Sequence, residues 1–180
     1  MTTRSAALTP WQRVCACDQQ TLLRLRACQN ASLTPLMRSL THLGDAPSWV
    51  LVALVLASSA GAGPGLAKLL AVAAVLATVL AQIVKRTCRR RRPSAGLADF
   101  AALIDNPDAF SFPSGHTAGA FAVAVALAGT GSCLGALLLG LAFAIAFSRV
   151  YLGAHYPLDV GAGAAIGALS GLVARSVCGL

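Results

Sequence analysis

The twelve residues Ser148–Asp159 combine an arginine, a histidine and an aspartate between two apolar runs. Ionisable residues at membrane depth are costly, so they indicate a functional site by default. If a helix begins at Pro157, a favoured first position, Asp159 lies in its first turn close to His155. An aspartate beside an imidazole fixes its tautomer and stabilises the cation that forms as the ring reacts. With Arg149 reaching the same pocket, we interpret His155 as a nucleophile directed at phosphate; an interfacial His–Asp pair is the alternative.

A second polar cluster is Phe112–Thr117, which reads Phe-Pro-Ser-Gly-His-Thr. Ser114 can cap a helix that starts here, and Gly115 lets backbone approach a ligand. Free N–H groups and the helix dipole at such an end form an anion site, with His116 at its opening. The alternative is an ordinary helix cap with a polar neighbour.

The third cluster is basic. Six of the fourteen Lys and Arg residues lie in the run 85–92. Lys85 and Arg92 can supply fixed positive charge, and the Arg fork of donors matches phosphate oxygens. A basic run directly after an apolar segment alternatively reports membrane topology or meets lipid head groups, and its placement argues against a nucleic-acid partner.

Composition decides the class of protein that carries these clusters. The chain is 57% hydrophobic and 11% charged, whereas soluble domains carry about 25% charged residues. We therefore expect an all-α integral membrane protein, with residues 1–180 forming a single membrane domain. Residues 1–46 should form an interfacial region of one or two amphipathic helices, broken near residues 30–35. Residues 47–180 should form a helix bundle of about five spans that carries the active site, at 47–62, 66–84, 117–130, 133–147 and 157–177, with a turn at 129–132.

Alternating these spans across the membrane brings the clusters to one level. The second span ends at Lys85, the third begins at His116, the fourth ends at Arg149, and the fifth begins near Pro157. All four points fall at the same membrane surface. This convergence supports a shared site more strongly than any single cluster does.

Three further features bear on partners and cofactors. Gly163, Gly167 and Gly171 are spaced four apart on the last span, which indicates close helix packing and, alternatively, a contact between copies in a homo-oligomer. The six cysteines lack metal-like spacing, so we expect free, mostly buried thiols. The absence of glutamate and the count of six aspartates argue against a two-metal hydrolase. No metal and no other cofactor is expected.

Taken together, the clusters resemble the three-part signature of the type 2 phosphatidic acid phosphatase family. Six residues separate Lys85 from Arg92-Pro93, and Pro113-Ser-Gly-His116 follows. Five residues then separate Ser148-Arg149 from His155, and three separate His155 from Asp159. The resemblance covers residues 85–159 and matches every signature position. The family contains membrane lipid phosphatases and shares its site with vanadium haloperoxidases and bacterial acid phosphatases.

The resemblance implies metal-independent hydrolysis of a phosphomonoester or diphosphate in two steps. His155 would be the nucleophile, Asp159 would hold its opposite ring N–H, and His116 would protonate the departing oxygen. The residues that would hold the phosphate oxygens are Lys85, Arg92, Ser114, Gly115 and Arg149. Arg90 lies outside the signature, and we expect its replacement by alanine to be mild.

The resemblance also implies a lipid phosphate substrate, and we expect undecaprenyl diphosphate or a phospholipid phosphate. The family usually faces its site away from the cytoplasm, so we expect a bacterial inner-membrane protein with an extracytoplasmic site, although the positive-inside rule favours the reverse. Two alternatives remain open: a phosphotransferase using an alcohol acceptor at the same site, and a non-catalytic membrane protein that binds anionic lipid.

Overall fold

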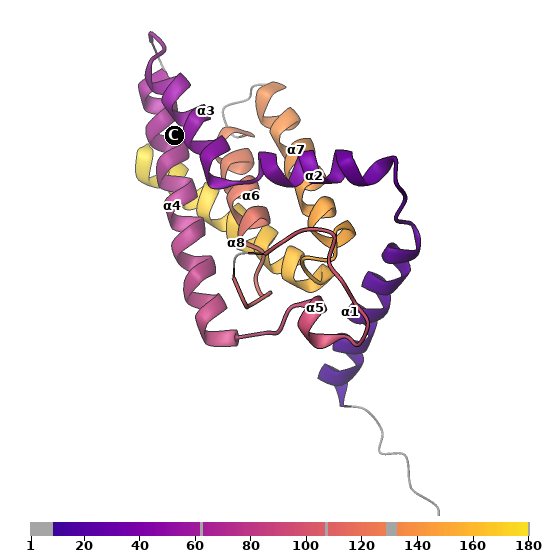
Figure 1. The fold of residues 1–180 in the computed structure, drawn as a ribbon. Helices are drawn as coiled ribbons and strands as arrows, with labels where there is room; N and C mark the ends of the chain where they lie inside the picture. Colours follow the sequence, from indigo (N-terminus) through magenta and orange to yellow (C-terminus); the bar gives the residue numbers. More distant parts are fainter. Residues whose placement is uncertain (1–8, 62, 107, 129–132, 180) are drawn as a thin grey trace, which may run out of the picture.

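The computed structural model describes residues 9–61, 63–106, 108–128 and 133–179. Within these ranges the chain forms helices and no strand, which confirms the all-α expectation (Figure 1). The expected turn at 129–132 lies outside the described residues. The helices are α1 (Pro10–Ala27), α2 (Leu33–Leu43), α3 (Ala46–Ala57), α4 (Gly63–Cys88), α5 (Pro93–Gly96), α6 (Gly115–Ala128), α7 (Cys133–Tyr151) and α8 (Pro157–Cys178).

The helix ends follow from local sequence. Helix α8 begins at Pro157, as predicted, and the Asp159 carboxylate accepts the backbone N–H of Tyr156 at 2.9 Å. It ends before Gly179, whose φ of 72° is a left-handed conformation that favours glycine. The predicted break in the N-terminal region is also present, because α1 ends at Ala27 and α2 begins at Leu33. Helix α1 begins at Pro10, directly after its N-cap Thr9.

Helix α6 lies at the centre of the bundle and packs against α4, α7 and α8. Its small side chains let the neighbouring helices approach closely, above all at the glycine ridge of α8. A Cβ atom on Gly163, Gly167 or Gly171 would lie 2.5, 2.3 or 2.7 Å from a backbone carbonyl oxygen of α6 or the residue before it. The ridge is therefore an internal packing surface, so a homo-oligomer would have to use another face of α8.

Three described helices are long and apolar enough to cross a membrane: α4, α7 and α8. Helices α2 and α3 meet at a bend of 55° and add a fourth span if the bent pair crosses as one. With 12 and 14 residues, α3 and α6 are only about 18 and 21 Å long, short of the roughly 20 residues that a full span needs. The chain is an integral membrane protein with three or four such spans plus the short α6, compared with the five expected.

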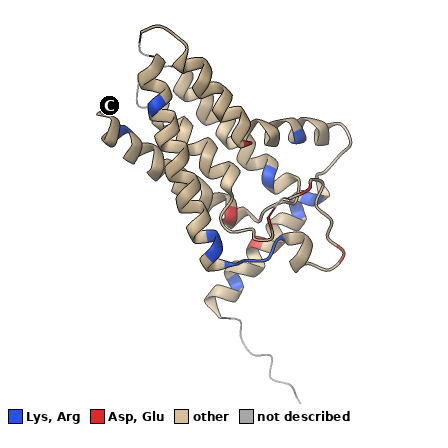
Figure 2. Cartoon of the chain, turned by 60° about the vertical axis from the view of Figure 1, so that its left-hand side comes forward, with Lys and Arg blue, Asp and Glu red and all other residues tan. Residues whose placement is uncertain are grey.

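Many of the charged residues lie at one end of the bundle, where α4 ends and the connecting loops lie (Figure 2). Helix α2 packs against α7, and α1 packs against α7 and α8, so the N-terminal helices border this end. The five cysteines described with their side chains are free, as expected. The prediction that most would be buried was wrong: Cys17, Cys28 and Cys88 are exposed, because they lie on α1 or at its end and at the last turn of α4.

Candidate active site

A cavity of about 780 Å³ opens at the charged end of the bundle, between the end of α4 and the start of α6. Members of all three sequence clusters line it, so segments far apart in the chain meet around one space. The predicted site residues on its wall are Lys85, Arg92, Gly115, His116, Arg149 and His155.

Arg92 is buried in the wall of the cavity, between Asp108 and His155. Its Nη1 donates to the carbonyl oxygen of Ala154 at 2.8 Å and lies 3.4 Å from Nε2 of His155. Its Nε donates to the backbone oxygen of Asp108 at 2.8 Å, and its Nη2 forms an ion pair with the Asp108 carboxylate. Arg92 therefore holds a cationic group directly beside the predicted nucleophilic atom.

Asp108 joins two of the predicted phosphate ligands. One carboxylate oxygen pairs with Lys85 Nζ at 2.7 Å and the other with Arg92. Burial acts to raise the pKa of Asp108, but hydrogen bonds and charges from these two cations lower it below its ordinary value. The carboxylate is thus bonded to donors that a phosphate would use.

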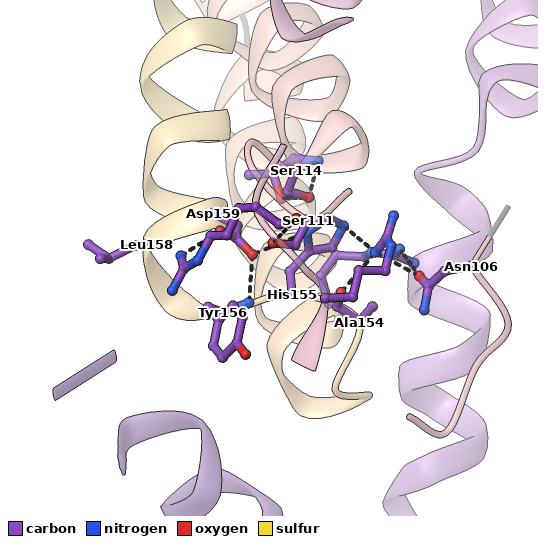
Figure 3. Close-up of polar contacts among 12 residues, drawn as sticks. Asn106, Ser111, Ser114, Ala154, His155, Tyr156, Leu158 and Asp159 are labelled. Atoms are coloured by element: carbon purple, nitrogen blue, oxygen red, sulfur yellow. Dashed lines mark hydrogen bonds and ion pairs between the residues drawn. The ribbon is translucent and has the colours of Figure 1, made fainter. Parts of the chain in front are cut away.

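Arg149 is fixed by neutral oxygens. Its Nη1 donates to Thr41 Oγ1 at 2.6 Å, and its Nη2 donates to Asn106 Oδ1 at 3.1 Å. The same Asn106 oxygen accepts from Arg92 Nη1 at 3.1 Å. The side-chain oxygen of Asn106 therefore accepts from both Arg92 and Arg149 and holds the two guanidinium groups close together. Figure 3 labels Asn106, with dashed lines marking its contacts.

His155 is 1% exposed and lies between α7 and α8, with Asp159 behind its ring (Figure 3). Nδ1 lies 3.6 Å from Asp159 Oδ2, which is an ion-pair distance, and has no hydrogen-bond partner among the described residues. Burial above all, together with the charges of Arg149 and Arg92, lowers the pKa of His155 from 6.5 to about 3, although Asp159 acts in the opposite direction. The ring is therefore neutral near pH 7, the state that a nucleophile requires.

Arg90 occupies a position that the sequence did not suggest. Its guanidinium pairs with Asp159 Oδ1 at 2.7 Å and with Asp18 Oδ2 at 2.6 Å, and its Cζ lies 4.1 Å from the centre of the Tyr156 ring. The other oxygen of Asp18 accepts the backbone N–H of Leu158 at 2.9 Å. Arg90 therefore links α1 to the aspartate behind His155, which argues against the expectation that its replacement by alanine is mild.

Loop contacts hold the arginine run in register. The backbone N–H of Ser111 donates to the carbonyl oxygen of Arg90 at 2.8 Å, and the Ser111 hydroxyl donates to the carbonyl oxygen of Arg91 at 3.2 Å. These bonds fix the backbone between Arg90 and Arg92, while the Arg91 side chain remains exposed.

Ser114 stands directly before α6, where the sequence predicted a helix cap. Its hydroxyl accepts from Thr117 Oγ1 at 3.0 Å and from the Thr117 backbone N–H at 3.5 Å, which places it as a helix cap. Its own backbone N–H donates to the carbonyl oxygen of Asp159 at 2.9 Å. Ser114 is fully buried and joins α6 to α8, whereas the next residue, Gly115, lines the cavity.

His116 lines the cavity and meets a carboxylate from the corner between α2 and α3. Its Nε2 lies 2.6 Å from Asp45 Oδ1. Sequence reasoning missed Asp45, together with Asp18, Thr41, Arg90 and Asn106. One signal was available: a carboxylate inside so apolar a chain needs a cationic or N–H partner, and the chain has only six aspartates to place.

The cavity continues away from this polar cluster along an apolar groove between α3 and α4. Its wall extends from Lys85 to Lys68 on α4, a span of about 25 Å at the helical rise of 1.5 Å per residue. Trp49, Leu54 and Val75 are among the side chains that line it. The site therefore combines a cationic end with a long apolar extension.

Comparisons with known proteins agree with this arrangement. Residues 66–178 match the PAP2 superfamily. The decaprenylphosphoryl-5-phosphoribose phosphatase of Mycobacterium tuberculosis is 34% identical over 154 residues, covering 79% of this chain and 78% of the relative. The bacitracin transport permease protein BcrC of Bacillus licheniformis is 40% identical over 101 residues, covering 56% of this chain and 50% of the relative.

Solved structures show the same fold. The crystal structure of Aquifex aeolicus LpxE superposes with a TM-score of 0.79 at 30% identity, covering 87% of this chain and 93% of that one. A PAP2-type phosphatidylglycerolphosphate phosphatase from Bacillus subtilis gives a TM-score of 0.75 at 24% identity, covering 92% and 86%. With a match over residues 66–178 and these relatives, the chain belongs to the PAP2 superfamily.

Proposed function

We propose that the chain is a metal-independent membrane phosphatase that hydrolyses a lipid phosphate or diphosphate through a phosphohistidine intermediate, with residues 1–180 working as one membrane domain. One observation carries this proposal: a single cavity has cations and two histidines at one end and an apolar groove at the other. Such a cavity suits a phosphate head group attached to a long hydrocarbon chain.

In the first step, neutral Nε2 of His155 attacks phosphorus in line. The N–P bond forms while the P–O bond to the lipid breaks, and its electron pair goes to the departing oxygen, which receives a proton from His116. Asp159 stabilises the ring through the Nδ1 proton, closing the present separation of 3.6 Å as charge develops.

In the second step, His116 takes a proton from water while the water oxygen bonds to phosphorus. The P–N bond breaks, and its electron pair returns to His155. Lys85, Arg92 and Arg149 neutralise the phosphoryl oxygens in both steps, where positioning and electrostatics provide most of the rate. The backbone of Gly115 adds an N–H group at the start of α6, and the Ser114 hydroxyl caps this helix start.

For the substrate, we favour a polyprenyl phosphate or diphosphate such as undecaprenyl diphosphate, followed by a phospholipid phosphate. The groove of about 25 Å leaves room for a long tail, and several relatives bear names that specify polyprenyl-linked substrates, such as undecaprenyl-diphosphatase. We place the protein in a bacterial inner membrane with its site on the extracytoplasmic side.

The function is tested by measuring phosphate release from a panel of polyprenyl and phospholipid phosphates with EDTA present. Wild-type protein should release phosphate and form an acid-labile phosphoenzyme, and His155→Ala should do neither. A fully active His155→Ala protein defeats the mechanism, and loss of activity with EDTA defeats metal independence.

Sidedness is tested with a variant that keeps Cys88 and replaces the other cysteines with serine. Cys88 is exposed at the end of α4, three residues from Lys85. An impermeant maleimide added outside intact cells should label it; labelling only after lysis places the site in the cytoplasm.

A further inference from the structure

The corner between α2 and α3 contacts the active site from outside the family signature. Thr41, near the end of α2, accepts a hydrogen bond from Arg149, and Asp45, just before α3, meets His116. These two contacts bridge 108 and 71 residues of sequence. This corner therefore forms part of the wall of the active-site cavity.

Both oxygens of the Asp45 carboxylate contact histidine rings. Oδ1 lies 2.6 Å from His116 Nε2, and Oδ2 lies 3.0 Å from His42 Nδ1. Asp45 occupies the N-cap position of α3, where an aspartate normally accepts a helix N–H, yet its side chain makes no such bond. Each carboxylate oxygen of Asp45 therefore faces a different imidazole nitrogen.

The positive charges around His116 make an anionic partner for its ring necessary. Lys85 and Arg149 line the same cavity, and both disfavour a second cation there. A general acid must nevertheless carry a proton to the departing oxygen. Within the described residues, Asp45 is the carboxylate that contacts the His116 ring.

We propose that Asp45 is a positioning residue for His116: it holds the Nε2–H, stabilises the imidazolium and leaves Nδ1 to exchange the proton with the leaving oxygen and then with water. This role rests on the proposed function of the same site. In the first step Nδ1 gives its proton to the lipid oxygen, and in the second Nδ1 takes one from water. Asp45 stays ionised throughout, as an orienting aspartate does beside a catalytic histidine.

The test compares leaving groups. A lipid alkoxide needs a proton in order to depart, whereas a nitrophenolate leaves with little help. Asp45→Asn should therefore lower kcat/KM for dioctanoyl phosphatidic acid by about 10²-fold, the lower end for general acid catalysis, and for p-nitrophenyl phosphate by less than about threefold. Asp105→Asn is the matched control, because Asp105 is exposed, lines the neighbouring cavity beside His116 and should keep wild-type rates on both substrates.

A double-mutant cycle makes the outcome decisive. In a His116→Ala background, Asp45→Asn should cost no further kcat/KM on the lipid substrate, because the carboxylate acts through that ring. Asp45 would have only a structural role if Asp45→Asn lowered kcat/KM equally on both substrates. The same conclusion would follow if Asp45→Asn lowered kcat/KM as much in the His116→Ala background as in the wild type. Wild-type protein that releases no phosphate from the lipid would overturn the proposed function, and this role with it.

Discussion

Arg90→Ala removes a cation that two buried carboxylates share. The side chains of Asp18 and Asp159 are 1% and 0% exposed, and each pairs with a different nitrogen of the Arg90 guanidinium. Without Arg90, Asp18 keeps the N–H of Leu158 and Asp159 keeps the N–H of Tyr156. Neither then has a full positive charge beside it.

The expected magnitudes follow from this burial. Removing one partner of a buried ion pair costs about 3–5 kcal/mol of unfolding free energy. Because 23% of the Arg90 side chain is exposed, we expect the lower end, about 3 kcal/mol. Asp159 also loses the bond that orients its carboxylate behind His155, and the loss of one oriented group in such a site lowers kcat by about 10²–10³-fold.

The assay is phosphate release from a lipid phosphate in detergent, with thermal unfolding measured on the same samples. Arg91→Ala is the matched control, because it removes the same charge from the next residue, whose side chain is exposed. It should stay within about threefold of wild type, as surface substitutions generally do. Arg90→Lys should recover part of the rate, because one ammonium group can reach only one of the two carboxylates at a time.

Two results would refute the reasoning. If Arg90→Ala and Arg91→Ala lose the same activity, the arginine run acts as a diffuse field of charge, and the individual contacts of Arg90 are unimportant. If Arg90→Ala loses stability but keeps kcat at a temperature where it remains folded, the guanidinium holds α1 in place without orienting Asp159.

Three other predictions rest on separate contacts. Gly167→Ala places a Cβ atom 2.3 Å from the Ala118 carbonyl oxygen and should lower the free energy of unfolding by about 1–3 kcal/mol in a denaturation experiment, whereas Gly161→Ala, with open space around it, should not. Asp108→Asn should strengthen competitive inhibition by inorganic phosphate about tenfold, because the ligand no longer displaces a carboxylate bonded to two cations; unchanged inhibition would contradict this. The His155 ring should remain neutral from pH 8 to pH 5 by NMR of the empty enzyme, because its pKa is lowered from 6.5 to about 3. The unfolded chain binds this proton first, so the stability that neutral His155 contributes is complete above pH 6.5 and is lost as the pH falls toward 3.

Local patterns in the sequence were sufficient for much of the fold. Proline at a first helical position predicts the start of α8 at Pro157, and the same logic places Asp159 in its first turn. The alternation of apolar runs predicts that Lys85, His116 and Arg149 face one end of the bundle. These inferences succeed because they depend on neighbours in the chain and on the need to cross a bilayer.

The contacts that sequence reasoning missed are all long-range. Arg90 and Asp18 are 72 residues apart, and Arg149 and Thr41 are 108 apart. No periodicity relates such pairs, because they depend on how α1 and α2 pack against α7 and α8. The end of the first predicted span, 47–62, was placed too late for a related reason, since α3 ends at Ala57. An apolar run gives the length of a hydrophobic segment, while helix breaks also depend on packing and caps.

The pairing of charges distinguishes Arg149 from the other cations of the site. Lys85 and Arg92 share Asp108, and Arg90 lies between two aspartates. Arg149 bonds only to neutral oxygens in the described part of the chain, and its buried Nε has no partner there. An uncompensated charge in a low-dielectric site attracts an anion most strongly. We therefore expect an arriving phosphate to gain most at Arg149, near the proposed nucleophile His155, and to complete its binding as it displaces Asp108 from the other two cations.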